Sequence, residues 1–148
     1  MTTTTILAVP TTRPIDPTES ASPVGRKQLF GTGVRSGLLA SAATVAFAAV
    51  AHAFDVSLRI SGKAIPLPGF AQLTFAGAIV GTILAVAMSR RARRPRRTFA
   101  TTTIVLTALS IVPDILVNAQ VATKGTLALT HVIAAAIVIP ALSSRLAD

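Results

Sequence analysis

Four long stretches without a charged residue constrain the fold of this chain more than any other feature. Three of them, residues 36–54, 64–89 and 125–144, run for 19, 26 and 20 residues. The fourth, 98–113, runs for 16 residues before Asp114, and apolar residues then continue to position 117. A bilayer core about 30 Å thick is crossed by roughly 20 residues of helix. Each stretch is therefore predicted to contain one membrane span.

The composition favours a membrane protein over a water-soluble one. Of the 148 residues, 51% are hydrophobic and only 13% are charged, whereas soluble domains carry about 25% charged residues. A soluble all-α protein would need helices with polar outer faces, which these stretches lack. We predict an all-α, four-helix transmembrane bundle with spans at about 36–54, 69–89, 98–117 and 125–143.

The first 30 residues differ in composition from the rest of the chain. They are rich in threonine and proline, and they have too little apolar content to offset the entropy of ordering. We expect residues 1–30 to be a disordered tail and residues 31–148 to be the membrane domain. Ala51-His52-Ala53 matches a signal-peptide cleavage pattern. We nevertheless expect the first helix to stay uncleaved, because 35 residues precede its apolar run.

Basic residues indicate how the spans are oriented. Six arginines fall within Arg90–Arg97, between the second and third spans, at positions Arg90, Arg91, Arg93, Arg94, Arg96 and Arg97. Together with the two termini, this side of the membrane holds eleven Lys and Arg residues, against three on the other side. Cytoplasmic loops carry the excess of basic residues. We therefore expect both termini and the arginine loop in the cytoplasm of a bacterial cell, with short loops giving up-down-up-down topology.

The arginine cluster allows three interpretations. We favour a topology determinant, which is compatible with contact to anionic lipid headgroups at about 1 kcal/mol per basic residue. A nucleic-acid surface would need interleaved aromatic residues and a fold that presents them. We therefore expect the lipid bilayer as partner and no nucleic acid.

Small residues in the second span indicate helix packing. Gly77 and Gly81 form a GxxxG pattern that Ala85 extends by one turn. Such a face lets helix backbones approach closely. The contact is expected within the chain, and a homo-oligomer or another membrane protein as partner remains open.

Asp114 is the most suggestive side chain for chemistry. A carboxylate inside a membrane is costly unless it is paired, hydrated or protonated. Ser110, Asp114 and Asn118 are spaced by four residues, which puts them on one helix face. One interpretation is a proton, cation or ligand site that faces the bundle interior. The other, which we favour, is a carboxylate hydrated at the outer interface.

Two histidines accompany this carboxylate in the outer half of the bundle. His131 in the fourth span is expected at the depth of Asp114, where the pair would form a pH-sensitive element. We favour a neutral histidine that helps helix packing, and an interfacial place for His52. Haem ligation by His52 and His131, or a metal site with Asp114, has no supporting spacing. No cofactor and no metal is expected.

The second half of the chain resembles a known family. The shared features are the basic loop Arg90–Arg97, the segment Ser110-Ile-Val-Pro113, and Leu127-Ala-Leu-Thr-His131 with the run that follows to Pro140. The family comprises small four-helix membrane proteins of actinobacteria and is catalogued only as a domain of unknown function. The resemblance implies four spans in a bacterial cell membrane and implies no activity.

Function is constrained mainly by what the sequence lacks. It contains no Gly-rich phosphate loop, no GxSxG and no HExxH motif. We therefore favour a non-enzymatic accessory or scaffold protein of the membrane. The alternative is a small oligomeric transporter or ion-coupled carrier with Asp114 and His131 at a polar site.

Overall fold

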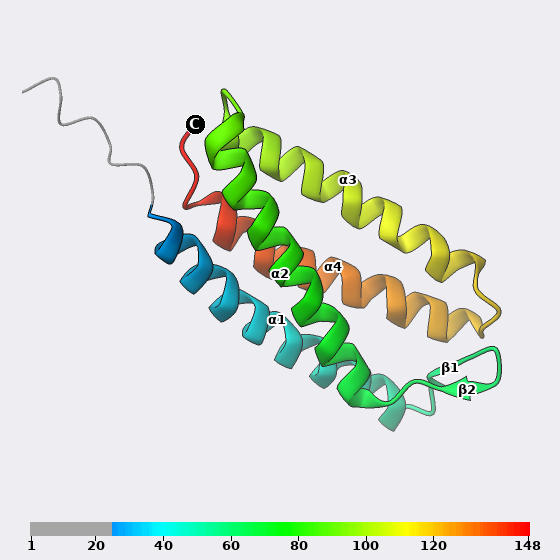
Figure 1. Ribbon diagram of the computed structural model, residues 1–148. Helices are drawn as coiled ribbons and strands as arrows, with labels where there is room; N and C mark the ends of the chain where they lie inside the picture. The colour runs from blue at the N-terminus through cyan, green and yellow to red at the C-terminus, as the bar shows by residue number, and fades with distance from the viewer. Residues whose placement is uncertain (1–24) are drawn as a thin grey trace, which may run out of the picture.

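A computed structural model describes residues 25–148, which form four long helices and one small hairpin (Figure 1). The helices are α1 (Arg26–Ala53), α2 (Leu67–Arg91), α3 (Pro95–Leu116) and α4 (Val121–Ser143). The hairpin strands are β1 (Arg59–Ile60) and β2 (Lys63–Ala64). Each helix is 22 to 28 residues long and apolar enough to cross a membrane. The predicted all-α fold with four spans is confirmed, and the chain is a multi-pass membrane protein.

The first helix is longer than the sequence predicted. It begins at Arg26, ten residues before the expected span, so residues 26–30 are helical rather than part of a disordered tail. The last proline before α1 is Pro23, and nothing after it interrupts the backbone hydrogen bonds. Arg26 and Arg35 are exposed, because a helix can continue into water beyond the apolar core. The rest of the predicted tail, residues 1–24, lies outside the described residues.

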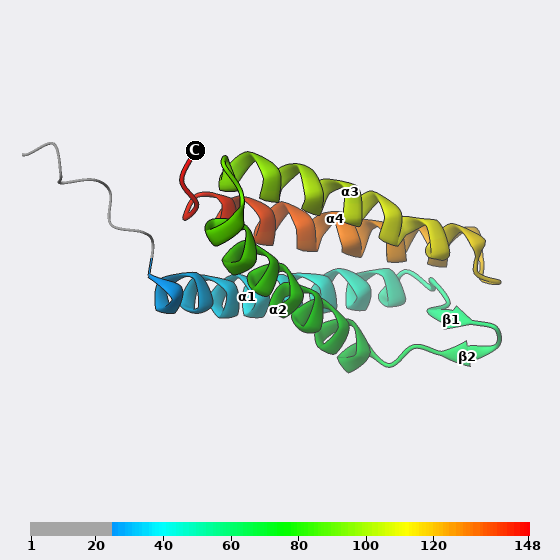
Figure 2. The ribbon, with the colours of Figure 1, turned by 45° about the horizontal axis from the view of Figure 1, so that its top comes forward.

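The helices alternate in direction around the bundle, but they are not equally packed. α1 contacts both α2 and α4, and α3 contacts chiefly α4. From the loop that joins them, α2 and α3 diverge toward the hairpin end (Figures 1 and 2). Only 6% of the apolar window of α3 is buried, against 33% for α1. α3 is therefore the peripheral helix.

The closest helix contact lies between α1 and α2 and involves a glycine pair that the sequence analysis overlooked. Gly33 and Gly37 of α1 are buried. A Cβ on Gly37 would lie 2.9 Å from the Cβ of Ala78, and one on Gly33 would overlap Thr82. Both distances are too short for a side chain, so this GxxxG pair lets the two backbones approach.

The predicted packing role of Gly77 and Gly81 needs correction. A Cβ on Gly77 would have no neighbour within 4 Å, and one on Gly81 would make only ordinary contacts of 3.8 and 3.9 Å. Among residues 25–148, Gly77 therefore lies at no close helix contact, and Gly81 lies at ordinary van der Waals distance from α4. Ala85, one turn further, is fully buried.

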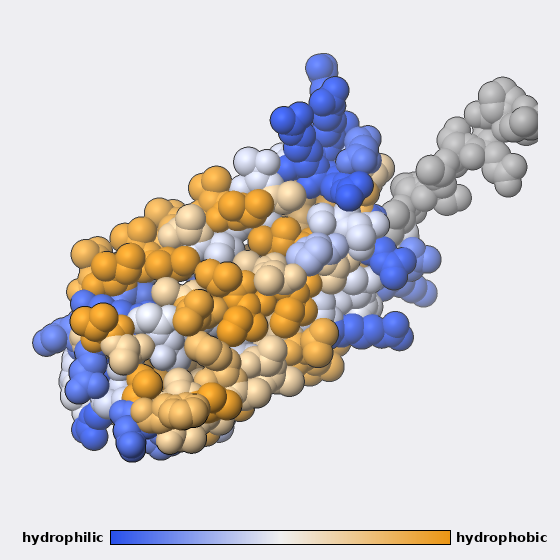
Figure 3. Space-filling view, turned by 180° about the vertical axis from the view of Figure 1, so that it is seen from behind, coloured by the Kyte–Doolittle hydropathy of each residue, from blue (hydrophilic) through white to orange (hydrophobic). Residues whose placement is uncertain are grey.

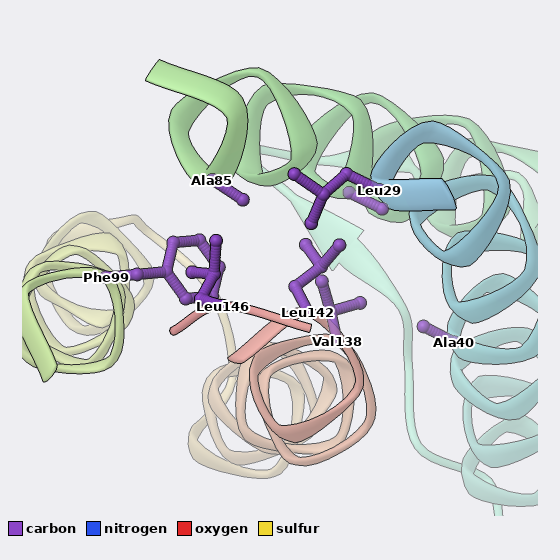
Figure 4. Close-up of a cluster of buried hydrophobic side chains, with 8 residues drawn as sticks. Leu29, Ala40, Ala85, Phe99, Val138, Leu142 and Leu146 are labelled. Atoms are coloured by element: carbon purple, nitrogen blue, oxygen red, sulfur yellow. The ribbon is translucent and has the colours of Figure 1, made fainter. Parts of the chain in front are cut away.

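The core is divided into two clusters at opposite ends of the bundle. The cluster at the end of the arginine loop contains Leu29, Ala40, Ala78, Ala85, Phe99, Val138, Leu142 and Leu146 (Figure 4). In this cluster the Phe99 ring of α3 lies beside Leu146, which follows α4. The cluster at the hairpin end contains Ala48, Leu58, Phe70 and Leu127.

The hairpin end is held by hydrogen bonds between the two loops. Ser61 and Gly62 at the turn have φ values of 50° and 82°, as in the type I′ turns that suit two-residue hairpins. The Ser61 N–H donates to the Asn118 carbonyl at 3.0 Å, and the Thr123 hydroxyl donates to the Ser57 carbonyl. Lys124 Nζ donates to the Ile115 carbonyl at 2.8 Å, which satisfies one free carbonyl at the end of α3.

Charged residues gather at the two ends of the bundle and leave an apolar band between them. The face in Figure 3 shows this band flanked by hydrophilic ends. Ten of the basic residues among positions 25–148 lie at the end of the arginine loop and three at the hairpin end. All six arginines of the loop are exposed. This distribution is the one expected for a bundle that crosses a bilayer.

The difference between the two GxxxG pairs can be tested with matched substitutions. Gly37→Ala is expected to destabilise the bundle by about 1–3 kcal/mol, because overpacking forces the helices apart. Gly77→Ala is expected to leave stability unchanged or raise it slightly, since space is open and alanine favours helix. Thermal unfolding in detergent, read by loss of the monodisperse size-exclusion peak, measures both. Equal losses for the two variants would contradict the structure.

Candidate functional site

One face of α3 carries a stripe of polar side chains. Thr103, Thr107, Ser110 and Asp114 follow at spacings of four, three and four, which places them on one side of the helix. From Ile104 onward the rest of the helix surface is apolar, and Ile104, Leu109 and Val112 are exposed on it. The polar stripe therefore faces away from the surrounding lipid, toward α2 and α4.

Beneath this stripe lies a cavity of about 630 Å³ between α2, α3 and α4. Its volume is within the range of about 300–1,000 Å³ that is usual for small-molecule sites. Phe99 bounds it at the arginine end, and Phe70, with Leu127, bounds it at the hairpin end. These residues belong to the two core clusters. The open space is thus confined to the side of the bundle between α2, α3 and α4, while α1 packs against α2 and α4.

The cavity opens sideways between α2 and α3. Leu73 and Val80 of α2 and Leu106 of α3 line it and are also 75%, 62% and 48% exposed. All three lie in the apolar band, where the surroundings in a membrane are acyl chains. The opening therefore leads to lipid rather than to water.

The two ends of the cavity differ in polarity. Toward the arginine end it is lined by Leu84, Val138, Ile139 and Phe99. Toward the hairpin end its wall is mixed, because Ser110, Asp114, Thr130 and His131 line it together with apolar residues (Ile60, Ile65, Phe70, Leu73 and Leu127). A molecule with one polar end would match this gradient.

Asp114 and His131 lie in contact at the polar end. Asp114 Oδ2 is 3.0 Å from His131 Nδ1, and the side chains are 14% and 38% exposed. The same Nδ1 lies 3.1 Å from the Leu127 carbonyl oxygen, with hydrogen-bond geometry. One N–H cannot point at both oxygens, and Asp114 Oδ2 has no hydrogen-bond partner in the part of the chain that the structure describes. His131 Nδ1 thus lies within hydrogen-bonding distance of two oxygens, and its geometry satisfies a hydrogen bond to the Leu127 carbonyl while Asp114 Oδ2 lies beside it.

The other hydroxyls of the cavity use their protons within their own helices. The hydroxyls of Thr103, Thr107 and Ser110 donate to backbone carbonyls at 2.7, 2.8 and 2.7 Å. Thr130 donates to the Leu127 carbonyl at 2.6 Å. Each hydroxyl oxygen keeps lone pairs that can accept a hydrogen bond.

The structure brings together only part of the predicted polar site. Ser110, Asp114 and His131 line the cavity, whereas Asn118 and His52 do not. α3 ends at Leu116, so the four-residue spacing no longer places Asn118 on its face. Instead the Asn118 backbone carbonyl holds the hairpin turn. His52 is exposed in the last turn of α1, so the two histidines do not share the cavity.

Sequence analysis missed the threonines of the cavity. Thr103 and Thr107 continue the spacing of Ser110 and Asp114, and that period was present in the sequence. Thr130 precedes His131 on α4, and nothing in the sequence shows which face it takes. Gly77 and Gly81 also line the cavity, where their lack of side chains makes room.

No metal centre is formed by the side chains of residues 25–148. No three His, Asp or Glu residues gather closely enough there to hold an ion. Asp114 and His131 alone provide two ligands, fewer than the three or four of a typical protein site.

Residues 24–148 match the family described as "Family of unknown function (DUF6069)". The chain belongs to this family. The match includes every element of the bundle and every residue that lines the cavity. It agrees with the resemblance noted from the sequence, while the actinobacterial source stays a prediction. No curated protein and no solved structure matches the chain.

A comparison of two polar substitutions separates a binding role of Asp114 from a packing role. A membrane carboxylate costs about 2.5–3.5 kcal/mol, and Asp114 Oδ2 makes no hydrogen bond that offsets this cost. Asp114→Asn is therefore expected to leave the melting temperature in detergent unchanged or to raise it.

The matched control is Thr44→Val in α1. Thr44 is fully buried and its hydroxyl is hydrogen-bonded to that of Thr74 across α1 and α2 at 3.1 Å. Its loss is expected to lower stability by about 0.6–1.7 kcal/mol. If Asp114→Asn destabilises the protein more than Thr44→Val does, the carboxylate is structural.

Proposed function

We propose that this protein is a non-enzymatic accessory protein of the membrane that binds a small amphiphilic molecule from the bilayer. The observation that supports this function most directly is the cavity of about 630 Å³ that opens to the apolar band between α2 and α3. Concave sites that are mostly apolar and carry a few convergent polar groups are typical of small-molecule binding.

A carrier role is the second candidate, and the polar pair supports it. Asp114 and His131 are ionisable groups in contact inside a membrane bundle, and such groups often mark substrate or proton pathways. In one copy, the buried clusters at Phe99 and Phe70 bound the cavity at both ends. Transport would therefore need a rearrangement of α3 or a second copy of the chain, so we favour binding over conduction.

The orientation proposed for this function follows from charge. The arginine loop would lie in the cytoplasm of a bacterial cell and contact anionic headgroups, and the hairpin would lie outside. In this orientation Asp114 and His131 occupy the outer half of the bundle. The ligand would then be taken from the outer leaflet.

Single cysteines test this orientation cleanly, since the chain has no cysteine of its own. Ala64→Cys in β2 and Ser144→Cys after α4 are both at exposed positions at opposite ends of the bundle. A membrane-impermeant maleimide is expected to label Ala64→Cys in intact cells, and Ser144→Cys only after the membrane is opened. The reverse pattern would overturn the proposed orientation.

Filling the cavity tests the binding function itself. Gly77→Leu places a side chain where a Cβ has no neighbour within 4 Å, so the bundle should fold with its cavity occupied. Labelling of the purified protein by a photoreactive dodecanol in phosphatidylcholine nanodiscs is expected to fall at least about fivefold on α2, α3 and α4.

The control for this experiment is Ala76→Leu. Ala76 is the exposed neighbour of Gly77 on α2 and does not line the cavity. Its labelling should equal that of the unmodified protein. If Gly77→Leu also leaves labelling unchanged, the cavity does not bind the probe and the proposed function is wrong.

A further inference from the structure

The chemistry of the polar end narrows the class of ligand that the cavity can hold. This step rests on the proposed binding function and concerns only the group that sits beside Asp114. Ligands are recognised by complementary hydrogen-bonding groups. The polar atoms of the cavity that lack a partner therefore determine which groups a ligand must bring.

Nearly every polar atom available to a ligand is an acceptor. Thr103, Thr107 and Ser110 already donate their protons to backbone carbonyls, and Thr130 does the same. Asp114 Oδ2 is a buried acceptor without a donor among residues 25–148. A ligand that brings hydrogen-bond donors would satisfy these atoms, and one that brings only acceptors would not.

His131 does not change this balance in its neutral form. Its Nδ1 is directed at the Leu127 carbonyl. With the proton on Nδ1, the other ring nitrogen Nε2 is an acceptor as well. A neutral His131 thus adds one more acceptor to the polar end.

The charge of the lining points the same way. Asp114 and His131 are the ionisable residues of the cavity wall, and no lysine or arginine of the described chain contributes to it. The nearby Lys124 is directed to the Ile115 carbonyl. α2 contributes apolar residues, glycines and Thr74. Any net charge on the wall with a neutral histidine is therefore negative, which disfavours an anionic head such as a carboxylate or a phosphate.

We propose that the cavity binds a cationic amphiphile with a primary or secondary ammonium head. The ammonium lies beside the Asp114–His131 contact and donates to Asp114 Oδ2 and to the Ser110 hydroxyl oxygen. An ammonium group has two or three donors and no acceptor, which matches the acceptors of this end. The apolar tail runs along α3 toward Phe99, about 22 Å away by the helical rise over the fifteen intervening steps.

Three photoreactive probes of equal chain length test this assignment: dodecylammonium, dodecanol and dodecanoate, each with its diazirine at the chain end. The full-length protein is placed in phosphatidylcholine nanodiscs, and labelled peptides are identified by mass spectrometry. Half-maximal labelling of the cavity is expected at a dodecylammonium concentration about tenfold lower in the unmodified protein than in Asp114→Asn. Labelling by dodecanol should differ less than about twofold between the two proteins.

Asp55→Asn is the matched control. Asp55 is an exposed carboxylate at the same end of the bundle and outside the cavity. Comparing one probe across the variants removes differences in how the probes partition into lipid. If Asp55→Asn weakens dodecylammonium labelling as much as Asp114→Asn does, the effect is general surface charge and the assignment is wrong.

A competition on the unmodified protein keeps the assignment testable if Asp114→Asn does not fold. Excess unlabelled dodecylammonium should displace the ammonium probe, and the same excess of dodecanol or dodecanoate should displace it at least about fivefold less well. Equal displacement by dodecanol would show that the head group is not recognised as a cation. Stronger displacement by dodecanoate would indicate that Asp114 and His131 are protonated and that the site prefers an anionic head group. Either outcome overturns the ligand class, while the binding function fails if Gly77→Leu leaves dodecanol labelling unchanged.

Discussion

The close contact of α1 with α2 is the constraint on which the rest of the bundle depends. Gly33 and Gly37 bring the two backbones together, and α1 also packs along α4. Three helices therefore form a compact unit, and α3 is left to lie against it. Phe99 and the Arg96–Asp148 ion pair, at 3.1 Å, fasten α3 at one end, and the Lys124–Ile115 hydrogen bond fastens it at the other. Because α3 packs chiefly on α4 and diverges from α2, a cavity remains between α2 and α3.

Such a cavity lowers the stability of the bundle, and its polar wall lowers it further. Every unfilled volume forfeits dispersion contacts, and Asp114 leaves a buried oxygen without a hydrogen bond. Elsewhere in the bundle polar groups are used for packing: Ser41 donates to the Ala71 carbonyl at 3.1 Å, and Thr44 is bonded to Thr74. In natural proteins, poor packing and buried polar groups without partners occur mainly at functional sites. The polar end of the cavity is the place in this bundle where that occurs.

The sequence predicted the spans and their alternation because long uncharged stretches have few stable alternatives in a membrane. It also predicted that Asp114 and His131 lie at the same depth, since antiparallel neighbours fix the depth of each residue. It did not predict which glycine pair lies at the contact, because GxxxG occurs both in α1 and in α2 and only the tertiary arrangement distinguishes them. Asn118 was misplaced because the end of α3 depends on loop hydrogen bonds that no local pattern shows. The hairpin was missed although Ser61-Gly62 is a turn signal.

The separation between the arginine loop and the polar pair matters for any cation bound in the cavity. Asp114 is seventeen residues beyond Arg97 on α3, or about 26 Å along the helix axis. The arginines are exposed at the opposite end of the bundle, where the ions of the aqueous phase screen their charge with a Debye length of about 8 Å. A cation beside Asp114 therefore experiences the attraction of the nearby carboxylate with little of the repulsion from the basic end. The proposed cation site and the basic residues that determine the proposed orientation can thus coexist at opposite ends of one chain.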